Sequence, residues 1–92
     1  MIAEIDKSKR IVIKEGKALK FPRLQYEIIN LMSSNPGVVY TREQLMHLFW
    51  QGALSDDRTV DVQIANIRKH LGKDSIETFV GVGYAWKNLN EN

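Results

Sequence analysis

Apolar positions along the chain change their spacing as the sequence proceeds, and the changes mark predicted strands and helices. Near the N-terminus, the β-branched run Ile11–Ile13 and the segment Ala18–Phe21 flank residues 15–17, Glu-Gly-Lys, which are typical of a turn. This pattern predicts an antiparallel hairpin or small sheet within residues 1–21.

The first predicted helix begins at Pro22, where a missing N–H does no harm because the first turn of a helix leaves its N–H groups unpaired. Helical spacing then places three apolar residues on one face: Leu24, Ile28 and Leu31. Residues 35–37, Asn-Pro-Gly, are typical of a helix end. We therefore expect a helix over residues 22–34.

A capping signal predicts the second helix. Thr41 stands three residues before Gln44, and a hydroxyl and an amide at this spacing can satisfy two backbone N–H groups at a helix start. Residues 38–40 are expected to be extended before it. The helix should end near Trp50 and bury three side chains: Leu45, Leu48 and Phe49.

The third predicted helix has the clearest two-sided pattern. It follows an expected loop at residues 51–57, where Ser55 or Asp56 is placed to cap it, and Gly72 is placed to end it. At about 100° per residue, one stripe within about 60° is apolar: Val60, Ile64, Ile67 and Leu71. The opposite face comprises Arg58, Val62, Ala65, Asn66 and Lys69, flanked by Thr59, Gln63 and Arg68.

Two strands are expected after this helix, at residues 75–80 and 84–87, joined through residues 81–83 into a β-hairpin. The order of elements describes an α+β fold, a winged helix-turn-helix with an N-terminal antiparallel sheet, a three-helix core and a C-terminal β-hairpin wing. We expect a single domain over residues 1–92. Its parts are the sheet at 1–21, the helical core at 22–72 and the wing at 73–92.

Composition narrows the chemistry. The 92 residues include no Cys and only two His, which excludes a disulfide framework, a thiolate metal cluster and a thiol nucleophile. No Ser-His-Asp or paired-carboxylate spacing stands out, so we predict no catalytic residue, no metal site, no cofactor and no enzyme. Neither a membrane span of about 20 apolar residues nor a signal peptide is apparent, so we expect a cytoplasmic protein without a membrane partner.

The formal charge of +2, from 13 Lys and Arg against 11 Asp and Glu, conceals two local excesses of positive charge. Residues 1–21 hold six basic and three acidic residues, and residues 58–73 hold four basic residues and one acidic residue. Such segments either bind polyanions or form a solvated face.

The outer face of the third predicted helix suits the major groove of DNA, which admits an α-helix. Val62 and Ala65 can contact a thymine methyl group, and the Asn66 amide can pair with adenine. Arg68 and Lys69 can reach phosphates or guanine. The same residues also fit a solvated surface with an exposed valine, alanine and asparagine, and both interpretations stay open.

Several motifs occur in order along the chain: Phe21-Pro22-Arg23 with Tyr26, Ile28 and Ile29, then Thr41-Arg42-Glu43-Gln44-Leu45, Asp56-Asp57-Arg58-Thr59-Val60-Asp61-Val62, Ile64 with Ile67-Arg68-Lys69 and Leu71-Gly72, and Gly81-Val82-Gly83-Tyr84. Together they closely resemble the OmpR/PhoB family, the DNA-binding output domains of bacterial two-component response regulators. The resemblance covers nearly the whole chain. It implies transcription regulation in a phosphorelay, with a four-stranded N-terminal sheet and the third helix in the major groove.

The resemblance also implies partners. They are direct repeats of double-stranded DNA, RNA polymerase, and a receiver domain in the full-length protein. A chain of this family is a monomer alone and forms a head-to-tail dimer on DNA. The loop that contacts the polymerase comprises Gln51, Gly52, Ala53, Leu54 and Ser55.

Roles for single residues follow from the same resemblance. The base-reading positions are Val62, Asn66 and Arg68, and the wing comprises Gly81, Val82, Gly83 and Tyr84. The phosphate-contacting positions are Arg42, Trp50, Arg58, Thr59, Gln63 and Lys69. Trp50 also fits a core-edge aromatic, and Arg58 also fits the partner of a nearby acid. Asp61 is expected to be a structural hydrogen-bond acceptor, since a carboxylate repels phosphate.

Four positions depart from the family pattern, which commonly has basic residues there: Ala65, Asn66, Val80 and Ala85. Each phosphate that a protein neutralises adds about 0.9 to the slope of its salt dependence, so we expect shallow salt dependence of DNA binding. The missing charges also favour an alternative, a winged helix that serves as a protein-protein interaction module without specific DNA binding.

Overall fold

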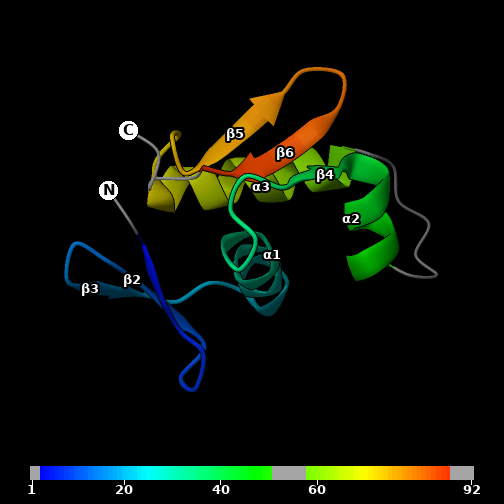
Figure 1. The fold of residues 1–92 in the computed structure, drawn as a ribbon. Helices are drawn as coiled ribbons and strands as arrows, with labels where there is room; N and C mark the ends of the chain where they lie inside the picture. Colours follow the sequence, from blue (N-terminus) through cyan, green and yellow to red (C-terminus); the bar gives the residue numbers. More distant parts are fainter. Residues whose placement is uncertain (1–2, 51–57, 88–92) are drawn as a thin grey trace.

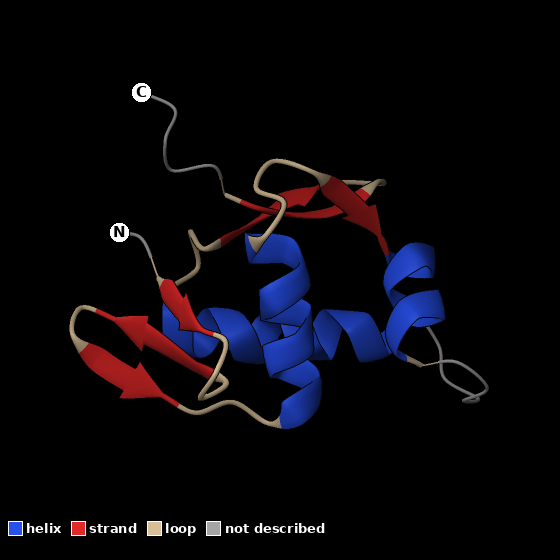
Figure 2. Cartoon of the chain, turned by 60° about the horizontal axis from the view of Figure 1, so that its bottom comes forward, coloured by secondary structure: helices blue, strands red, loops and turns tan. Residues whose placement is uncertain are grey.

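Nine regular elements run through residues 3–50 and 58–87, which are the residues that the computed structural model describes (Figure 1). In chain order they are β1 (Glu4–Asp6), β2 (Ile11–Lys14), β3 (Lys17–Leu19), α1 (Arg23–Ser33), β4 (Val39–Thr41), α2 (Arg42–Phe49), α3 (Arg58–Leu71), β5 (Ile76–Phe79) and β6 (Gly83–Trp86). The strands form two antiparallel sheets on different sides of the helices (Figure 2).

The N-terminal sheet has the strand order β1-β2-β3, with Val12 of the central strand opposite Ile5 on one side and Leu19 on the other. The predicted turn is present, and Gly16 adopts a φ of 78°, which an L side chain rarely does. The described residues contribute three strands to this sheet, so the expectation of four is wrong for this part of the chain. After β3 the chain turns into α1 at Pro22, so it adds no further strand to this sheet.

Helix α2 begins where the sequence predicts, and α1 begins at Arg23, one residue after its predicted start. Pro22 is the N-cap of α1, and its carbonyl accepts a hydrogen bond from the Tyr26 N–H at 2.9 Å. The capping box of α2 is confirmed, because the Gln44 N–H donates to Thr41 Oγ1 at 3.0 Å and the Thr41 N–H donates to Gln44 Oε1 at 2.8 Å. Both helix starts are therefore determined locally.

Helix α2 buries less than the sequence suggests. Leu45 is fully buried and Phe49 packs against the core, as predicted, but Leu48 is 52% exposed. The two-turn helix places Leu45 and Phe49 one turn apart on its inner side, and Met46 fills the space beside them. This leaves Leu48 turned outward, so its predicted burial is wrong.

The core lies between α1 and α3. The predicted apolar stripe of α3 is confirmed, since Val60, Ile64 and Ile67 are fully buried and Leu71 is 5% exposed. They pack with fully buried residues of α1: Ile28, Ile29 and Met32.

At the C-terminal end of α3 the Lys14 ammonium donates to the Leu71 carbonyl at 2.7 Å, where a helix leaves its carbonyls unpaired. The N-terminal sheet thus supports the end of α3.

The second sheet has the order β4-β6-β5, so the predicted C-terminal hairpin is present with β4 as an added strand. Thr41 pairs with Gly83, and a Cβ at Gly83 would lie 2.1 Å from the Tyr40 carbonyl oxygen. Only glycine allows the two backbones to approach this closely. Through β4, which leads directly into α2, this sheet joins the wing to the helical core.

Candidate nucleic-acid interface

The face of α3 that points away from the core is polar and accessible. Val62 is 54% exposed, and the other residues predicted on this face are also exposed: Arg58, Ala65, Asn66 and Lys69. The flanking residues Thr59, Gln63 and Arg68 are half-buried, as their positions on the helix predict. A helix that is fully buried on one side therefore presents short polar and aliphatic side chains on the other.

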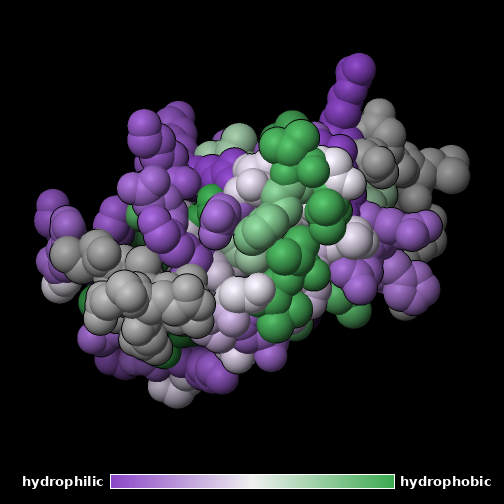
Figure 3. All heavy atoms as spheres, turned by 45° about the horizontal axis from the view of Figure 1, so that its top comes forward, coloured by the Kyte–Doolittle hydropathy of each residue, from purple (hydrophilic) through white to green (hydrophobic). Residues whose placement is uncertain are grey.

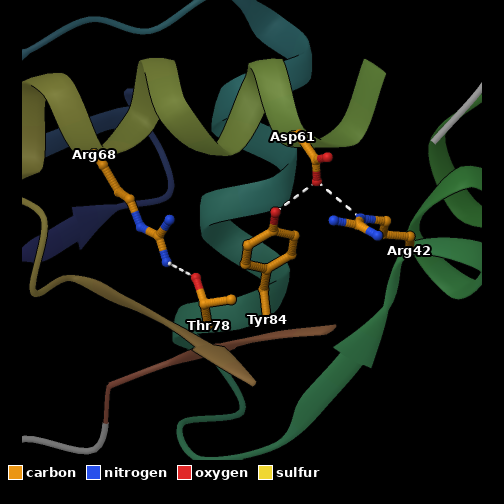
Figure 4. A network of polar contacts seen from close by, with 5 residues as sticks. All are labelled: Arg42, Asp61, Arg68, Thr78 and Tyr84. Atoms are coloured by element: carbon orange, nitrogen blue, oxygen red, sulfur yellow. Dashed lines mark hydrogen bonds and ion pairs between the residues drawn. The ribbon is translucent and has the colours of Figure 1, made fainter. Parts of the chain in front are cut away.

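Asp61, near the start of α3, connects this helix to two other elements (Figure 4). Its Oδ1 accepts from Arg42 Nε of α2 at 2.9 Å and from the Tyr84 hydroxyl of β6 at 2.5 Å. The prediction that Asp61 is a structural acceptor is confirmed.

Burial and charge oppose each other at this carboxylate. Partial burial acts to raise the pKa of Asp61, but the hydrogen bonds from Tyr84 and Arg42 and the positive charge of Arg42 outweigh it, so the pKa lies below its ordinary value. At Tyr84, burial is the largest cause that raises the pKa of the phenol, and the Asp61 carboxylate raises this pKa further. Asp61 is therefore ionised and Tyr84 is neutral near pH 7.

Arg68, near the C-terminal end of α3, joins this helix to the wing hairpin. Its Nε and Nη2 donate to the Ile76 carbonyl at 3.0 and 2.6 Å, and Nη2 also donates to Thr78 Oγ1 at 2.6 Å. The guanidinium carbon lies 5.5 Å from the centre of the Tyr84 ring, within the range of a cation-π contact. Arg68 was predicted to read bases, and in the free domain its donors face the wing, so that role stays a prediction.

Two further predicted phosphate contacts have partners inside the domain. The Gln25 amide of α1 donates to Gln63 Oε1 at 2.9 Å, which fixes Gln63 at the edge of the α3 face. Trp50 is half-buried against the core, with its ring edge-on to that of Phe49. The core-edge interpretation of Trp50 is thus confirmed, and a phosphate contact by its accessible part stays a prediction.

The wing tip is apolar. Phe79, Val80 and Val82 are 38%, 92% and 56% exposed, and Gly81 between them adopts a φ of 77°. Hydrophobic residues form a ridge across the face that Figure 3 brings forward, the side of the molecule on which β5 and β6 lie. A groove separates the wing from the start of α2, lined by Thr41, Arg42, Glu43 and residues 78–84. We call it the α2-wing groove.

Comparison with known proteins identifies this arrangement. The family model described as transcriptional regulatory protein, C terminal, matches residues 16–86. The chain belongs to this family. The transcriptional regulatory protein VxrB of Vibrio cholerae serotype O1 is 34% identical over 84 residues, which cover 90% of this chain and 34% of VxrB. The chain spans about a third of the length of the curated relatives it matches.

Solved structures of response regulators are similar to this chain and support the same family. DrrB, a Thermotoga maritima OmpR/PhoB homolog, has a TM-score of 0.85 and 35% identity, covering 94% of this chain and 42% of DrrB. The DNA-binding domain of the response regulator AdeR, in complex with an intercistronic region, has a TM-score of 0.83 and 30% identity, with 94% of each chain covered. The predicted family and the winged-helix fold class are both confirmed.

Part of the predicted site lies outside the residues that the structure describes. This applies to the expected polymerase-contacting loop at residues 51–55 and to the expected cap of α3 at Ser55 or Asp56. In the ranges 3–50 and 58–87, no helix is both long and apolar enough to cross a membrane.

The sequence alone did not identify the residues of other elements that contact α3 and support the candidate interface. Lys14 and Gln25 come from elements remote from α3 in the sequence, whereas Thr78 lies on β5, the next element along the chain. The contacts of all three depend on packing that a single sequence does not reveal. Tyr84 was predicted as part of the wing motif, but its hydrogen bond to Asp61 was not. A tyrosine with a glycine at its N-terminal side in a strand was the available signal, since a buried phenol needs a partner.

Proposed function

We propose that this chain binds double-stranded DNA sequence-specifically, as the output domain of a two-component response regulator that controls transcription. The observation that carries the proposal is the two-sided character of α3: its inner stripe is fully buried, while its outer face is exposed beside a wing. A helix supported in this way can enter the major groove without unfolding any core contact. Similarity to the AdeR domain, solved with an intercistronic region, supports the same function.

We assign base reading to the centre of the exposed α3 face. Asn66 offers a donor and an acceptor that match adenine, and the exposed Val62 side chain matches a thymine methyl group. Arg68 lies at the flank of this face, and a base contact by Arg68 requires its guanidinium to leave the Ile76 carbonyl.

Phosphate contacts are assigned to the border of this surface. Arg42 lines the α2-wing groove and binds Asp61, so residues 58–63 form the end of α3 nearest this groove, whereas Lys69 lies near the opposite end. The set is Arg42, Trp50, Arg58, Thr59, Gln63 and Lys69. The wing, Gly81 to Tyr84, would follow the neighbouring groove of the duplex.

The full-length protein would add what this chain does not carry. A receiver domain that dimerises on phosphorylation would raise the local concentration of output domains on adjacent half-sites of a direct repeat. Residues 51–55 would contact RNA polymerase in that assembly, where two copies bind head to tail. As relatives of this chain are transcription regulators, we propose no catalytic activity.

Asn66→Ala tests the proposed base contact. A duplex is first selected from a random library by its binding to this chain, and each of its positions is then replaced by the other three base pairs. For the wild-type chain, one adenine should be preferred by about 1–3 kcal/mol, and Asn66→Ala should abolish the preference at that position alone. Equal affinity of the wild type for all four base pairs at every position would contradict sequence-specific readout by α3.

The apolar wing tip favours one alternative, a protein-interaction module. Exposed apolar residues such as the valines at positions 80 and 82 are typical of a surface that a partner protein covers. In that case the chain would bind neither a random nor a selected duplex at tens of micromolar, at any salt concentration.

A further inference from the structure

Three elements meet at one carboxylate beside the α2-wing groove. Arg42 comes from α2, Asp61 from α3 and Tyr84 from β6, and both donors bind the same oxygen of Asp61. Figure 4 shows them approaching this oxygen from different directions. Tyr84 is only 7% exposed, so the side of Asp61 that faces the wing is fixed by a largely buried group.

Asp61 and Tyr84 both act on the Arg42 guanidinium, which stays accessible in this arrangement. Asp61 is bound through Nε, and a side-chain hydrogen bond with Tyr84 also contributes to the raised pKa of Arg42. The side chain is 48% exposed and lines the α2-wing groove. An arginine held through Nε presents its terminal amino groups as a planar fork, a geometry that matches the oxygens of a phosphate.

We infer that Asp61 and Tyr84 are positioning residues for DNA binding, which hold Arg42 so that its terminal amino groups meet a backbone phosphate. This inference rests on the proposed function and adds a role that an acid at a DNA interface does not ordinarily have. A free arginine must lose side-chain freedom when it binds, and Asp61 removes much of that freedom beforehand. Tyr84 in turn restricts the carboxylate.

Charge alone makes the opposite prediction, which makes the inference testable. A carboxylate near DNA repels phosphate, so replacing it with a neutral side chain should strengthen binding. If Asp61 positions Arg42, its removal should weaken binding despite the gain in net positive charge. Asp74 provides the matched control because it is an exposed acid, just beyond α3, with no hydrogen bond or ion pair among the described residues.

The experiment measures the affinity of the 92-residue chain for the selected duplex and for a random duplex by fluorescence anisotropy. Asp61→Ala should lower affinity for the selected duplex by about 2- to 10-fold, the range expected when one long side chain is set free. Asp74→Ala, with the same change in charge, should leave this affinity unchanged or raise it. Tyr84→Phe changes no charge and should cause a smaller loss of the same sign.

A double-mutant cycle separates positioning from a general loss of structure. In an Arg42→Ala background, Asp61→Ala should cause no further loss of affinity, because no guanidinium is left to orient. Removal of the carboxylate there should strengthen binding, as charge alone predicts. Melting curves by circular dichroism show whether each variant is folded at the temperature of the assay.

Each outcome decides between the two accounts. Weaker binding by Asp61→Ala that disappears in the Arg42→Ala background supports positioning. Stronger binding by Asp61→Ala, equal to that of Asp74→Ala, would overturn the inference while leaving DNA binding intact. A loss that persists in the Arg42→Ala background would also overturn it. A wild-type chain that binds neither duplex would remove the proposed function, and this inference with it.

Discussion

Ile64 and Val62 lie two residues apart on α3 in opposite environments. Ile64 is fully buried against the core, while Val62 is 54% exposed on the outer face. The two side chains differ by a single methylene group, so their surroundings rather than their chemistry decide what each contributes. A buried aliphatic side chain excludes water and fills space, whereas an exposed one is free to contact a ligand.

Truncating these two residues should therefore have very different effects. Ile64→Ala should lower the free energy of unfolding by about 2–5 kcal/mol, because it leaves a cavity under α3. Val62→Ala should change it by less than about 0.5 kcal/mol, as surface substitutions do. Urea denaturation followed by circular dichroism measures both. A loss below about 1 kcal/mol for Ile64→Ala would mean that the assigned inner face of α3 is wrong.

Acid titration of Asp61 offers a second test at this scale. Hydrogen bonds and the charge of Arg42 hold its folded pKa below the ordinary carboxyl value, so Asp61 adds stability above about pH 4 that is lost as the pH falls through the folded pKa. The wild type should thus be more stable than Asp61→Asn at pH 7, and the difference should shrink below about pH 4. Urea denaturation at several pH values measures it, and a difference that stays constant down to pH 2 would contradict the assigned hydrogen bonds.

At the scale of elements, the sequence predicts best where local rules act. The cap at Thr41, the turn at Gly16 and the stripe of α3 all depend on residues within a few positions of one another, and all are confirmed. Pairing of β4 with β6 depends on residues more than 40 positions apart in the sequence, such as Tyr40 and Tyr84, and was not predicted. Leu48 was misplaced because periodicity over a two-turn helix does not show how wide its buried face is.

The same limit applies to the site. The exposed face of α3 follows directly from its buried stripe, so Val62 and Asn66 were placed correctly from sequence. The hydrogen-bond partners of Arg68 and Arg42 were not predicted, because the contacts of Arg68 with β5 and of Arg42 with Asp61 form only when the elements pack. Long side chains at the border of a helix have several partners within reach, and tertiary structure selects among them.

The apolar wing predicts an unusual response to added charge. Val80 is 92% exposed at a tip where Phe79 and Val82 are also accessible, and the described residues 79–83 carry no charge. Val80→Arg should therefore steepen the slope of log affinity against log salt by about 0.9, the value for one additional phosphate neutralised. Ala18→Arg on the N-terminal sheet adds the same charge and serves as the control, with no expected change of slope. If Val80→Arg leaves the slope unchanged as well, the wing tip does not approach the duplex.

At the scale of the whole molecule, the two sheets hold α3 from both ends. Lys14 of the N-terminal sheet binds the last carbonyl of α3, while Asp61 and Arg68 connect the helix to the wing sheet. The position of α3 relative to the wing is thus set by contacts at several points along the helix. A domain built in this way presents a fixed surface to a partner, which limits the conformational entropy lost on binding.

The most direct test of the account is the affinity of the wild-type chain for a selected direct-repeat duplex and for a random duplex, each at low and at moderate salt. We predict tighter binding to the direct repeat at both salt concentrations, and weaker binding to both duplexes as salt rises. Equal affinity for the two duplexes would contradict sequence-specific recognition by α3. Absence of binding to either duplex at tens of micromolar protein would contradict DNA binding by this chain altogether.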